Sequence, residues 1–534
     1  VTPDSCFALG TMANGLVIID RDGRMRLHFS QTNGFLSNTV SCLYMDRQNN
    51  LWVGMDGGVA VLEYNSPLSE FIIPGGSGPS DFCRYHGVLY ITCNDGVYYL
   101  DEVDGRFKMI DGIAGNAQSF FFFQINGELF VTVNEGIYRI QGTKAHLVMP
   151  SREMSVPVLH MSALSLAPDL IVAGKSSGAD LLRYNASHPQ RLSWLGSIPE
   201  VYEYIRQAME AEPGVVWLGT MDAGLIRLTF NKDRLLEPVI ERFGMEHGLP
   251  PGGAVFYNPG GRPVFCTKKG VYQFNPAQNR FSPDPFFKDL GLGINPDESI
   301  IVADAQGNFW ANLGKESAVY KKLPDGQYKL EKAQLARFVD EVINIIFPES
   351  DGVIWFGAAN RVIRFSHGLQ ERALTDFPAI IRRVALAGDS VVYYGAALPG
   401  HRLQDPAAQR FPFRHNALRF DFSASSYLNP RANAFRTRLE GFDAGWSSWS
   451  RETRRDYTNL PAGKYRFRVQ ARNIFQQESK EDLYAFTITP PWYRSWWAWL
   501  FYLLCAGGLI AGLVRVRTRQ LEERGRALEK IVQE

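Results

Sequence analysis

The side chains best suited to catalysis or metal binding are scattered along this chain. Its nine histidines are dispersed, and no HxxEH, HExxH, GxSxG or P-loop pattern occurs, so the spacings that build a zinc site, an activated nucleophile or a phosphate cradle are missing. The six cysteines show neither CxxC pairs nor zinc-type spacing. We therefore predict no catalytic, cofactor-binding or metal-binding residue and expect no cofactor.

Acidic and aromatic residues gather in places that favour structural roles. Asp46 opens the polar run DRQNN and Asp304 opens DAQG; Asp side chains stabilise turns by accepting from backbone N–H groups, so we interpret both as turn formers rather than calcium or substrate ligands. The run Phe120–Phe123 allows two interpretations, a sugar-stacking platform or a buried strand, and the buried strand is favoured.

Cys83 and Cys93 are close enough in sequence to suggest a disulfide. A hairpin that turns at His86-Gly87 would pair Cys83 with Tyr90 and leave Cys93 several residues away. We therefore expect mostly free core thiols, with this disulfide as the alternative in an oxidising compartment.

The composition indicates a large folded chain that does not bind nucleic acid. Hydrophobic residues make up 45% and aromatic residues 13% of the 534 residues, which excludes general disorder. The formal net charge of +1 leaves no overall electrostatic attraction for nucleic acid.

A short phrase returns at intervals of about 40 residues through residues 1–372, a period typical of propeller repeats. Its copies include LWVGMDGGVAVLE, LYITCNDGVYYLD, VWLGTMDAGLIRLTF, FWANLGKESAVYKK and IWFGAANRVIRF. Each copy joins two strand-like runs across a glycine-containing turn. Trp52, Trp217, Trp310 and Trp355 recur in this phrase and are predicted to be structural.

Nine copies exceed the usual four to eight blades of a β-propeller. Either one ring is unusually large, or the copies within residues 1–65 are the end of a preceding propeller and seven copies complete a ring. We expect the second arrangement.

Residues 373–490 predict an immunoglobulin-like sandwich, because alternating runs are separated by turns about every ten residues. The phrase LPAGKY suggests a tyrosine corner, in which the Tyr465 hydroxyl bonds to upstream backbone while Phe467 and Val469 point inward. Tyr457 and Tyr465 are predicted to be structural.

Both regions resemble known families. The phrases LSNTVSCLYMDRQNNLWVGMDGGVAVLE and VADAQGNFWANLG are similar to the two-component-regulator propeller repeat, found in exterior sensor regions of bacterial hybrid histidine kinases. Residues 373–490 resemble the three-tyrosine (Y_Y_Y) domain, through Leu439–Asp443, Trp446, Tyr457 and Asn459–Leu460. The resemblance implies a sensor with an unknown small-molecule or oligosaccharide ligand.

The segment Trp496–Val514 is apolar and uncharged, and as a helix it would rise about 28 Å, enough to span a bilayer. Tryptophans crowd its leading end, whereas Arg515 and Arg517 follow it, so the positive-inside rule predicts a periplasmic bulk and a cytoplasmic tail. We expect a single-pass protein of the bacterial inner membrane with a transmembrane helix at 495–515 and the start of a signalling helix at 516–534.

Two features suit this segment to signal transmission. Pro491 and Trp492 join the sandwich to the span, and proline should make this joint stiff. Leu521 and Leu528 belong to an incomplete heptad pattern that predicts a homodimer in resembling proteins. Because the chain opens at Val1 without a signal peptide and stops in a charged helical pattern, we expect a part of a longer protein.

Three functions compete. The favoured one is a signal-transducing receptor whose output, a histidine kinase or a diguanylate cyclase, lies beyond these residues. A membrane-tethered propeller enzyme, such as a lyase or glycosidase, is supported only by fold analogy. A passive carbohydrate-binding module is the third.

Overall fold

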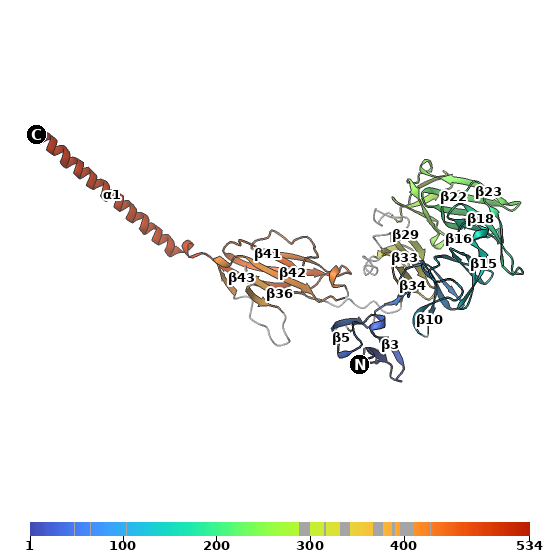
Figure 1. The fold of residues 1–534 in the computed structure, drawn as a ribbon. Coiled ribbons are helices and arrows are strands. Elements are labelled where there is room, and N and C mark those ends of the chain that lie inside the picture. The colour runs from blue at the N-terminus through green and yellow to red at the C-terminus, as the bar shows by residue number, and fades with distance from the viewer. Residues whose placement is uncertain are drawn as a thin grey trace. The chain divides into compact units, whose positions relative to one another are not determined.

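The computed structural model describes residues 1–533 except 47–48, 65, 103, 288–298, 314–316, 332–341, 367–376, 387–389, 396–408 and 428. Contacts divide the chain into two compact units, Val1–Arg372 and Ala373–Glu534. Both are built from β-strands, and the second also carries one long helix (Figure 1). The predicted all-β fold is confirmed.

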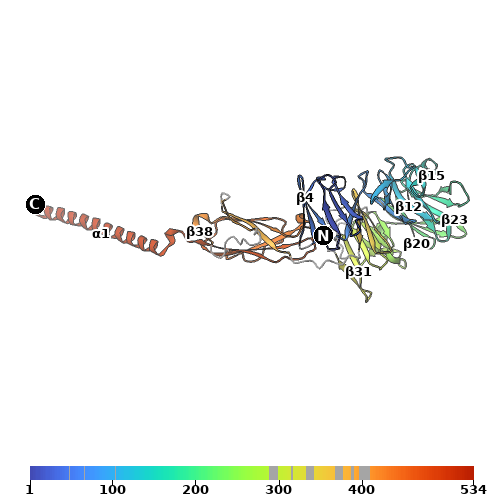
Figure 2. The ribbon, with the colours of Figure 1, turned by 90° about the horizontal axis from the view of Figure 1, so that it is seen from below.

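Seven sheets of the first unit form a ring, seen from two sides in Figures 1 and 2. Six are antiparallel meanders of consecutive strands: β8 (Pro79–Tyr85), β9 (Val88–Cys93), β10 (Gly96–Asp101) and β11 (Arg106–Met109); β12 (Ser119–Ile125), β13 (Glu128–Val133), β14 (Gly136–Gln141) and β15 (Lys144–Pro150); β16 (Val158–Leu164), β17 (Ala167–Lys175), β18 (Ala179–Tyr184) and β19 (Leu192–Ser197); β20 (Ile205–Glu212), β21 (Val215–Thr220), β22 (Ala223–Asn231) and β23 (Arg234–Phe243), with β24 (Gly252–Gly253) beside β22; β25 (Val255–Tyr257), β26 (Val264–Thr267), β27 (Gly270–Asn275) and β28 (Arg280–Pro283); β29 (Ser299–Ala303), β30 (Phe309–Leu313), β31 (Ser317–Lys322) and β32 (Tyr328–Glu331).

The seventh sheet closes the ring, because its outer strand is β7, which precedes the first sheet of the ring in sequence. It contains β33 (Ile343–Pro348), β34 (Val353–Ala358), β35 (Arg361–Ser366) and β7 (Leu68–Ile72), and Phe71 of β7 pairs with Val362 of β35. The Phe71 ring lies 5.5 Å from Trp355 in the seventh sheet and 6.1 Å from Phe107 in the first. Inner strands contact each other in order from β8 through β12, β16, β20, β25, β29 and β33, and β33 contacts β8. The ring therefore has seven members, and a single larger ring is wrong.

The first two repeat copies lie outside this ring. They form two three-stranded sheets: β1 (Phe7–Gly10), β2 (Leu16–Ile19) and β3 (Met25–Phe29), then β4 (Val40–Met45), β5 (Asn50–Met55) and β6 (Gly58–Glu63). Leu16, Ile18, Leu51 and Val53 are buried in a core that the two sheets share. Their origin as the end of a preceding propeller stays a prediction.

The β8–β9 hairpin turns where the sequence predicts. His86 and Gly87 have φ of 48° and 82°, the left-handed conformation that a two-residue hairpin turn needs. Cys83 pairs with Tyr90, and all six cysteines are free. The expected pairing is confirmed, and the alternative disulfide is wrong for this structure.

The second unit begins with a two-sheet sandwich. One sheet orders β37 (Ser390–Tyr394), β36 (Ala379–Leu386), β39 (Leu418–Ala424) and β41 (Arg454–Tyr457); the other orders β38 (Gln409–Pro412), β43 (Asp482–Thr489), β42 (Gly463–Arg472) and β40 (Ala434–Glu440). Inward-facing Phe420, Phe467 and Tyr484 are fully buried between the sheets. Short 3-10 helices occupy connections of the chain: η1 (Gln31–Asn33), η2 (Ser151–Glu153), η3 (Met245–His247), η4 (Pro259–Gly261), η8 (Phe413–His415), η9 (Pro430–Ala432) and η10 (Trp492–Arg494).

A single helix, α1 (Trp496–Gln533), follows the sandwich. The predicted span and the predicted signalling helix are thus one uninterrupted helix. Within the described residues, this is the one helix long and apolar enough to cross a membrane, with a candidate span of Trp496–Leu528 and a mean hydropathy of 1.9.

The predicted tyrosine corner is present. The buried Tyr465 hydroxyl donates to the carbonyl oxygen of Pro461 at 2.7 Å, and Phe467 and Val469 are fully buried. The Tyr457 hydroxyl instead donates to a carboxylate oxygen of Asp443 at 2.8 Å.

We expect the two tyrosine hydroxyls to contribute unequally to stability. Tyr465→Phe removes a neutral hydrogen bond and should cost about 0.5–1.5 kcal/mol, whereas Tyr457→Phe removes one to a charged group and should cost about 1.5–3 kcal/mol. Hydrogen exchange of the β41 and β42 amides measures both losses. A larger loss for Tyr465→Phe would contradict this order.

Candidate functional site

Three of the four repeat tryptophans bond to an acid six residues earlier. The pairs, each from indole Nε1 to a carboxylate oxygen, are Trp52 with Asp46 at 2.9 Å, Trp310 with Asp304 at 2.8 Å and Trp355 with Glu349 at 2.8 Å. The other oxygen of Asp304 accepts from the backbone N–H of Gln306 and of Asn308. The turn-forming role of Asp304 is confirmed, and its second bond to tryptophan is a feature that sequence analysis missed.

Trp217 has a different environment. Its ring centroid lies 5.2 Å from those of Phe243 and Phe265, and the Arg227 guanidinium lies 5.6 Å from it. The residue is 5% exposed. Trp217 therefore packs against aromatic side chains of the core and one guanidinium group, and its ring is not exposed on the surface.

Polar side chains tie the inner strands of neighbouring sheets together. One carboxylate oxygen of Asp81 in β8 accepts from the Phe122 N–H in β12 at 2.8 Å. Gln207 in β20 bonds to both backbone groups of Phe256 in β25, accepting at 2.9 Å and donating at 2.6 Å. Asp81 and Gln207 each follow a β-bulge of their strand, which lets a side chain reach the next sheet.

His160 occupies the corresponding post-bulge position in β16. Its ring stacks on Phe121 of β12, with centroids 3.7 Å apart. Burial lowers the pKa of His160 to about 4, although hydrogen bonds with the backbone of Ala208 and Met161 oppose the shift. The run Phe120–Phe123 lies in β12, where Phe122 and Phe123 are buried and Phe120 and Phe121 are half-buried, so the interpretation as a buried strand is confirmed in part.

Because of the Asp81 carboxyl, we expect the free energy of unfolding of the ring to fall as pH rises. Burial raises the pKa of Asp81 to about 7, although hydrogen bonds from the Phe122 and Phe82 N–H groups lower it. The unfolded carboxyl has a pKa of about 3.9, so the folded chain holds this proton more tightly. Its contribution to stability is complete below about pH 4 and is lost as pH rises to about 7.

We therefore expect Asp81→Asn to flatten the stability profile between about pH 4 and pH 7, as hydrogen exchange of the β8 and β12 amides would measure. The exposed acid Asp169 offers a matched control, and Asp169→Asn should keep the slope of the parent chain. A slope unchanged by Asp81→Asn would refute the assignment.

The expected transmission residues lie at one end of the second unit. Pro491 precedes η10 with a φ of −65° and extended backbone. Trp492 is 66% exposed, and its ring stacks on Trp497 with centroids 6.2 Å apart. Arg515, Arg517, Leu521 and Leu528 lie along α1 with exposed side chains. Among the described residues, these four side chains of α1 form no contact with Pro491 or Trp492.

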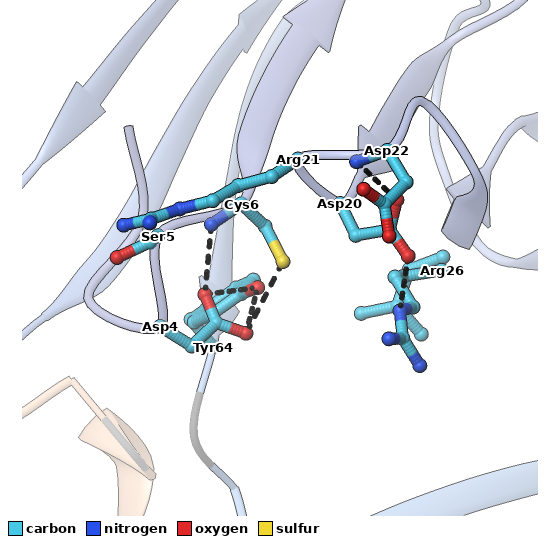
Figure 3. A pocket seen from close by; sticks show the side chains of 9 residues that line it. Asp4, Ser5, Cys6, Asp20, Arg21, Asp22, Arg26 and Tyr64 are labelled. Carbon is cyan, nitrogen blue, oxygen red and sulfur yellow. Dashed lines mark hydrogen bonds and ion pairs between the residues drawn. The ribbon is translucent and has the colours of Figure 1, made fainter.

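A hollow of about 660 Å³ lies beside the two N-terminal sheets (Figure 3). On one side the Asp4 carboxylate accepts from the Tyr64 hydroxyl at 2.9 Å and from Cys6; on the other the Asp20 carboxylate accepts from Arg26 Nε at 3.1 Å. Burial raises the pKa of Asp4, but hydrogen bonds from Thr2, Tyr64 and Cys6 outweigh it and lower the pKa. Both acids are thus engaged by neighbouring groups.

Arginine and tryptophan side chains alternate on the outer face of the sheet that contains β40 and β42. The order is Arg468, Trp446, Arg436, Trp449 and Arg472, with guanidinium-to-ring distances of 5.3, 5.2, 4.7 and 4.7 Å. Each such contact is worth about 0.5–1 kcal/mol at an exposed site. Each indole contacts two guanidinium groups, so this row stiffens the sheet.

Sequence analysis missed this row, although a signal exists. Trp446 and Trp449 belong to the phrase WSSWS, and their partners are Arg436 of β40 and Arg468 and Arg472, four residues apart on β42. Ser447 N–H donates to the Thr437 carbonyl at 2.9 Å, which lays the tryptophan segment along β40.

The described part of the chain contains no group of three or more His, Cys, Asp or Glu side chains arranged to hold a metal ion.

Comparisons with known proteins agree with this architecture. Residues 34–57 match the family model described as two component regulator propeller, and residues 426–490 match the Y_Y_Y domain. The chain is 23% identical over 322 residues to histidine kinase P4 of Formosa agariphila, covering 56% of this chain and 22% of that protein. It therefore spans only about a fifth of that relative.

A solved structure with a similar fold is an extracellular domain. The extracellular domain of a hybrid two-component system from B. thetaiotaomicron aligns with a TM-score of 0.68 and 17% identity, over 92% of this chain and 67% of that one. The extracellular domain of a one-component system from B. thetaiotaomicron aligns with a TM-score of 0.46 and 15% identity, over 92% of this chain and 69% of that one. The chain therefore contains one segment similar to the two component regulator propeller, at residues 34–57, and one similar to the Y_Y_Y domain, at residues 426–490.

Proposed function

We propose that this chain is the ligand-sensing and signal-transmitting region of a two-component-type sensor in the bacterial inner membrane. The observation that carries the proposal is the order of parts: a seven-membered ring, a sandwich, and then the one described helix able to span a membrane. The fold shared with the extracellular domain of a hybrid two-component system supports it.

The ring and sandwich face the periplasm, and the end of α1 faces the cytoplasm. Trp496 and Trp499 at the start of the helix and Arg515 and Arg517 farther along support this orientation. The output of the longer protein is a histidine kinase, in keeping with the name of the relative. The ligand is a small molecule or an oligosaccharide, on the strength of the family resemblance alone.

Cysteine labelling in spheroplasts tests this orientation. Cys42 is exposed in β4, and a Glu523→Cys variant places a thiol on α1; Cys505→Ala removes the thiol within the span. A membrane-impermeant maleimide should label Cys42 in intact spheroplasts and the residue 523 thiol only after permeabilisation. Labelling of both sites in intact spheroplasts would refute the proposed topology.

Transmission requires two arrangements of the chain that bind the ligand with different affinity. The joint between β43 and α1 suits this role, because Pro490 and Pro491 restrict the backbone there. A stiff joint converts a movement of the sandwich into a movement of the helix.

The partner of α1 is a second copy of this chain. Val514, Leu521 and Leu528 form one column at seven-residue spacing, and Gly507 continues the same column into the span. A second column contains Thr518 and Gly525 and is continued by Ala511. Since α1 is one helix, both columns form a single seam on which small residues permit close approach within the membrane.

Disulfide crosslinking in membranes tests the dimer. Leu521→Cys lies on the seam and should crosslink readily, whereas Glu523→Cys lies on the opposite side of the helix and should not. Equal crosslinking at both positions, or none at Leu521→Cys, would contradict the seam.

A further inference from the structure

The end of the sandwich that leads into α1 carries an unbalanced set of cations. β43 ends at Thr489 and α1 begins at Trp496. A chain reaches about 3.4 Å per residue, so this end lies within about 24 Å of the start of the helix. A membrane around the start of α1 would therefore lie close to this end of the sandwich.

The strand register places two of the cations side by side. Arg410 in β38 and Lys464 in β42 both pair with Thr487 of β43, from opposite sides. Residues in register share a face of the sheet, so both side chains lie on the outer face, and both are exposed. Arg414 in η8 and Arg494 in η10 are exposed near the same end.

The acids that the structure describes at this end have other partners. Glu440 accepts from Arg468 at 2.8 Å, Asp443 accepts from the Tyr457 hydroxyl at 2.8 Å, and Asp456 pairs with Arg419 at 2.9 Å. Among the described residues, Arg410, Arg414, Lys464 and Arg494 form no ion pair. The outer face of the opposite sheet differs, because Asp421 pairs there with both Arg383 and Arg454.

An apolar side chain projects at the same end. Phe442 is 52% exposed in the loop after β40, and its ring contacts Tyr457 at 6.0 Å, which anchors the loop. Gly441 lies against Lys464, since a Cβ there would stand 2.8 Å from the Lys464 carbonyl oxygen. An exposed aromatic ring beside cations that form no ion pair suits the boundary between water and lipid, although Arg414 Nε also donates to His415 Nε2 at 3.1 Å.

We propose that this end of the sandwich docks on anionic phospholipid headgroups through Arg410, Arg414, Lys464 and Arg494, with Phe442 at the boundary of the acyl chains. The inference rests on the proposed function, since it needs α1 to be inserted in a bilayer. Cations near an anionic surface are attracted to it over about one Debye length, roughly 10 Å at moderate salt. Docking would hold the sandwich against the membrane while α1 transmits the signal.

Fluorescence quenching in lipid nanodiscs tests the docking on the whole chain. The exposed Ala462, in the loop before β42 at this end, becomes the label site as Ala462→Cys in a Cys42→Ser, Cys505→Ser background. We expect nitroxide headgroup lipids to quench this label strongly in discs containing phosphatidylglycerol and weakly in discs of phosphatidylcholine. A label at Arg431→Cys, at the other end of the sandwich, should stay unquenched in both.

Two charge-matched double variants identify the cations responsible. Arg410→Gln with Lys464→Gln should lower the docking equilibrium at least about tenfold. Arg431→Gln with Arg451→Gln removes the same charge from exposed sites at the other end and should leave quenching unchanged. Equal losses in both variants, or equal quenching in the two lipid mixtures, would overturn the proposal.

A label within the span separates this proposal from the proposed function. A fluorophore at Leu504→Cys, in a chain that keeps the Cys505→Ser replacement, should be quenched by acyl-chain nitroxides. Without that quenching α1 is not inserted and the proposed function fails. With it, an unquenched label at Ala462→Cys overturns the docking alone.

Discussion

Replacing Trp310 with alanine is expected to destabilise the sixth and seventh sheets by about 3–5 kcal/mol, the usual range for deleting a buried tryptophan. Trp310 is 1% exposed. Its ring lies 5.9 Å from Phe356 and 5.8 Å from Phe365, both in the seventh sheet, so one side chain joins two sheets. The change also removes the indole donor to Asp304.

Local hydrogen exchange is the suitable measurement, because a chain with two units need not unfold in one step. Amides of β30, β31 and β34 should exchange much faster in Trp310→Ala, while those of β42 should be unaffected. Trp310→Phe is the matched control, since it keeps an aromatic ring and loses the indole hydrogen bond, and it should cost less. Equal losses in the two variants would indicate that the Asp304 bond, rather than packing, holds the sheets.

Much of the fold could be predicted from residues that act locally. The turn acid and the tryptophan six residues later recur because both belong to one hairpin, so Asp304 and Trp310 mark a sheet without any knowledge of its neighbours. The pairing of Cys83 with Tyr90 follows likewise from the turn at His86 and Gly87. Both depend on contacts between residues close in sequence, where spacing determines geometry.

Contacts between distant residues could not be predicted in this way. β7 pairs with β35, which lies near the other end of the first unit in sequence. No feature of the run Leu68–Ile72 identifies β35 as its partner strand. Asp81, His160 and Gln207 occupy equivalent positions after a bulge in their strands. Because they are three different residue types, a search for repeated residues in the sequence does not find this position. The arginine and tryptophan row likewise assembles from a loop and two strands.

Polar side chains on the inner strands contribute to the closure of the ring. The inner-strand side chains that differ between sheets are those expected to confer specificity, yet Asp81 and Gln207 bond to neighbouring backbone. These two residues therefore account for the closure of the ring before any ligand is considered.

The seam proposed for α1 predicts that substitutions at two adjacent glycines have unequal effects on helix pairing. Gly507 lies in the heptad column with Val514 and Leu521, whereas Gly508 lies about 100° around the helix from it. No atom outside the helix lies within 4 Å of a Cβ at either position, so neither substitution disturbs the folded chain itself. Gly507→Leu should separate the paired helices and reduce Leu521→Cys crosslinking by about tenfold or more, because close approach at small residues is lost.

Gly508→Leu is the matched control, since it adds the same side chain one residue away and should leave the crosslinking of Leu521→Cys unchanged. Gly508 and Gly512 form a competing small-residue pair at four-residue spacing. If Gly508→Leu abolished crosslinking and Gly507→Leu did not, the helices would meet on that second face. The contact face of the membrane span would then differ from the contact face of the cytoplasmic tail. A signal that crosses the membrane would have to include a rotation of the paired helices about their axes.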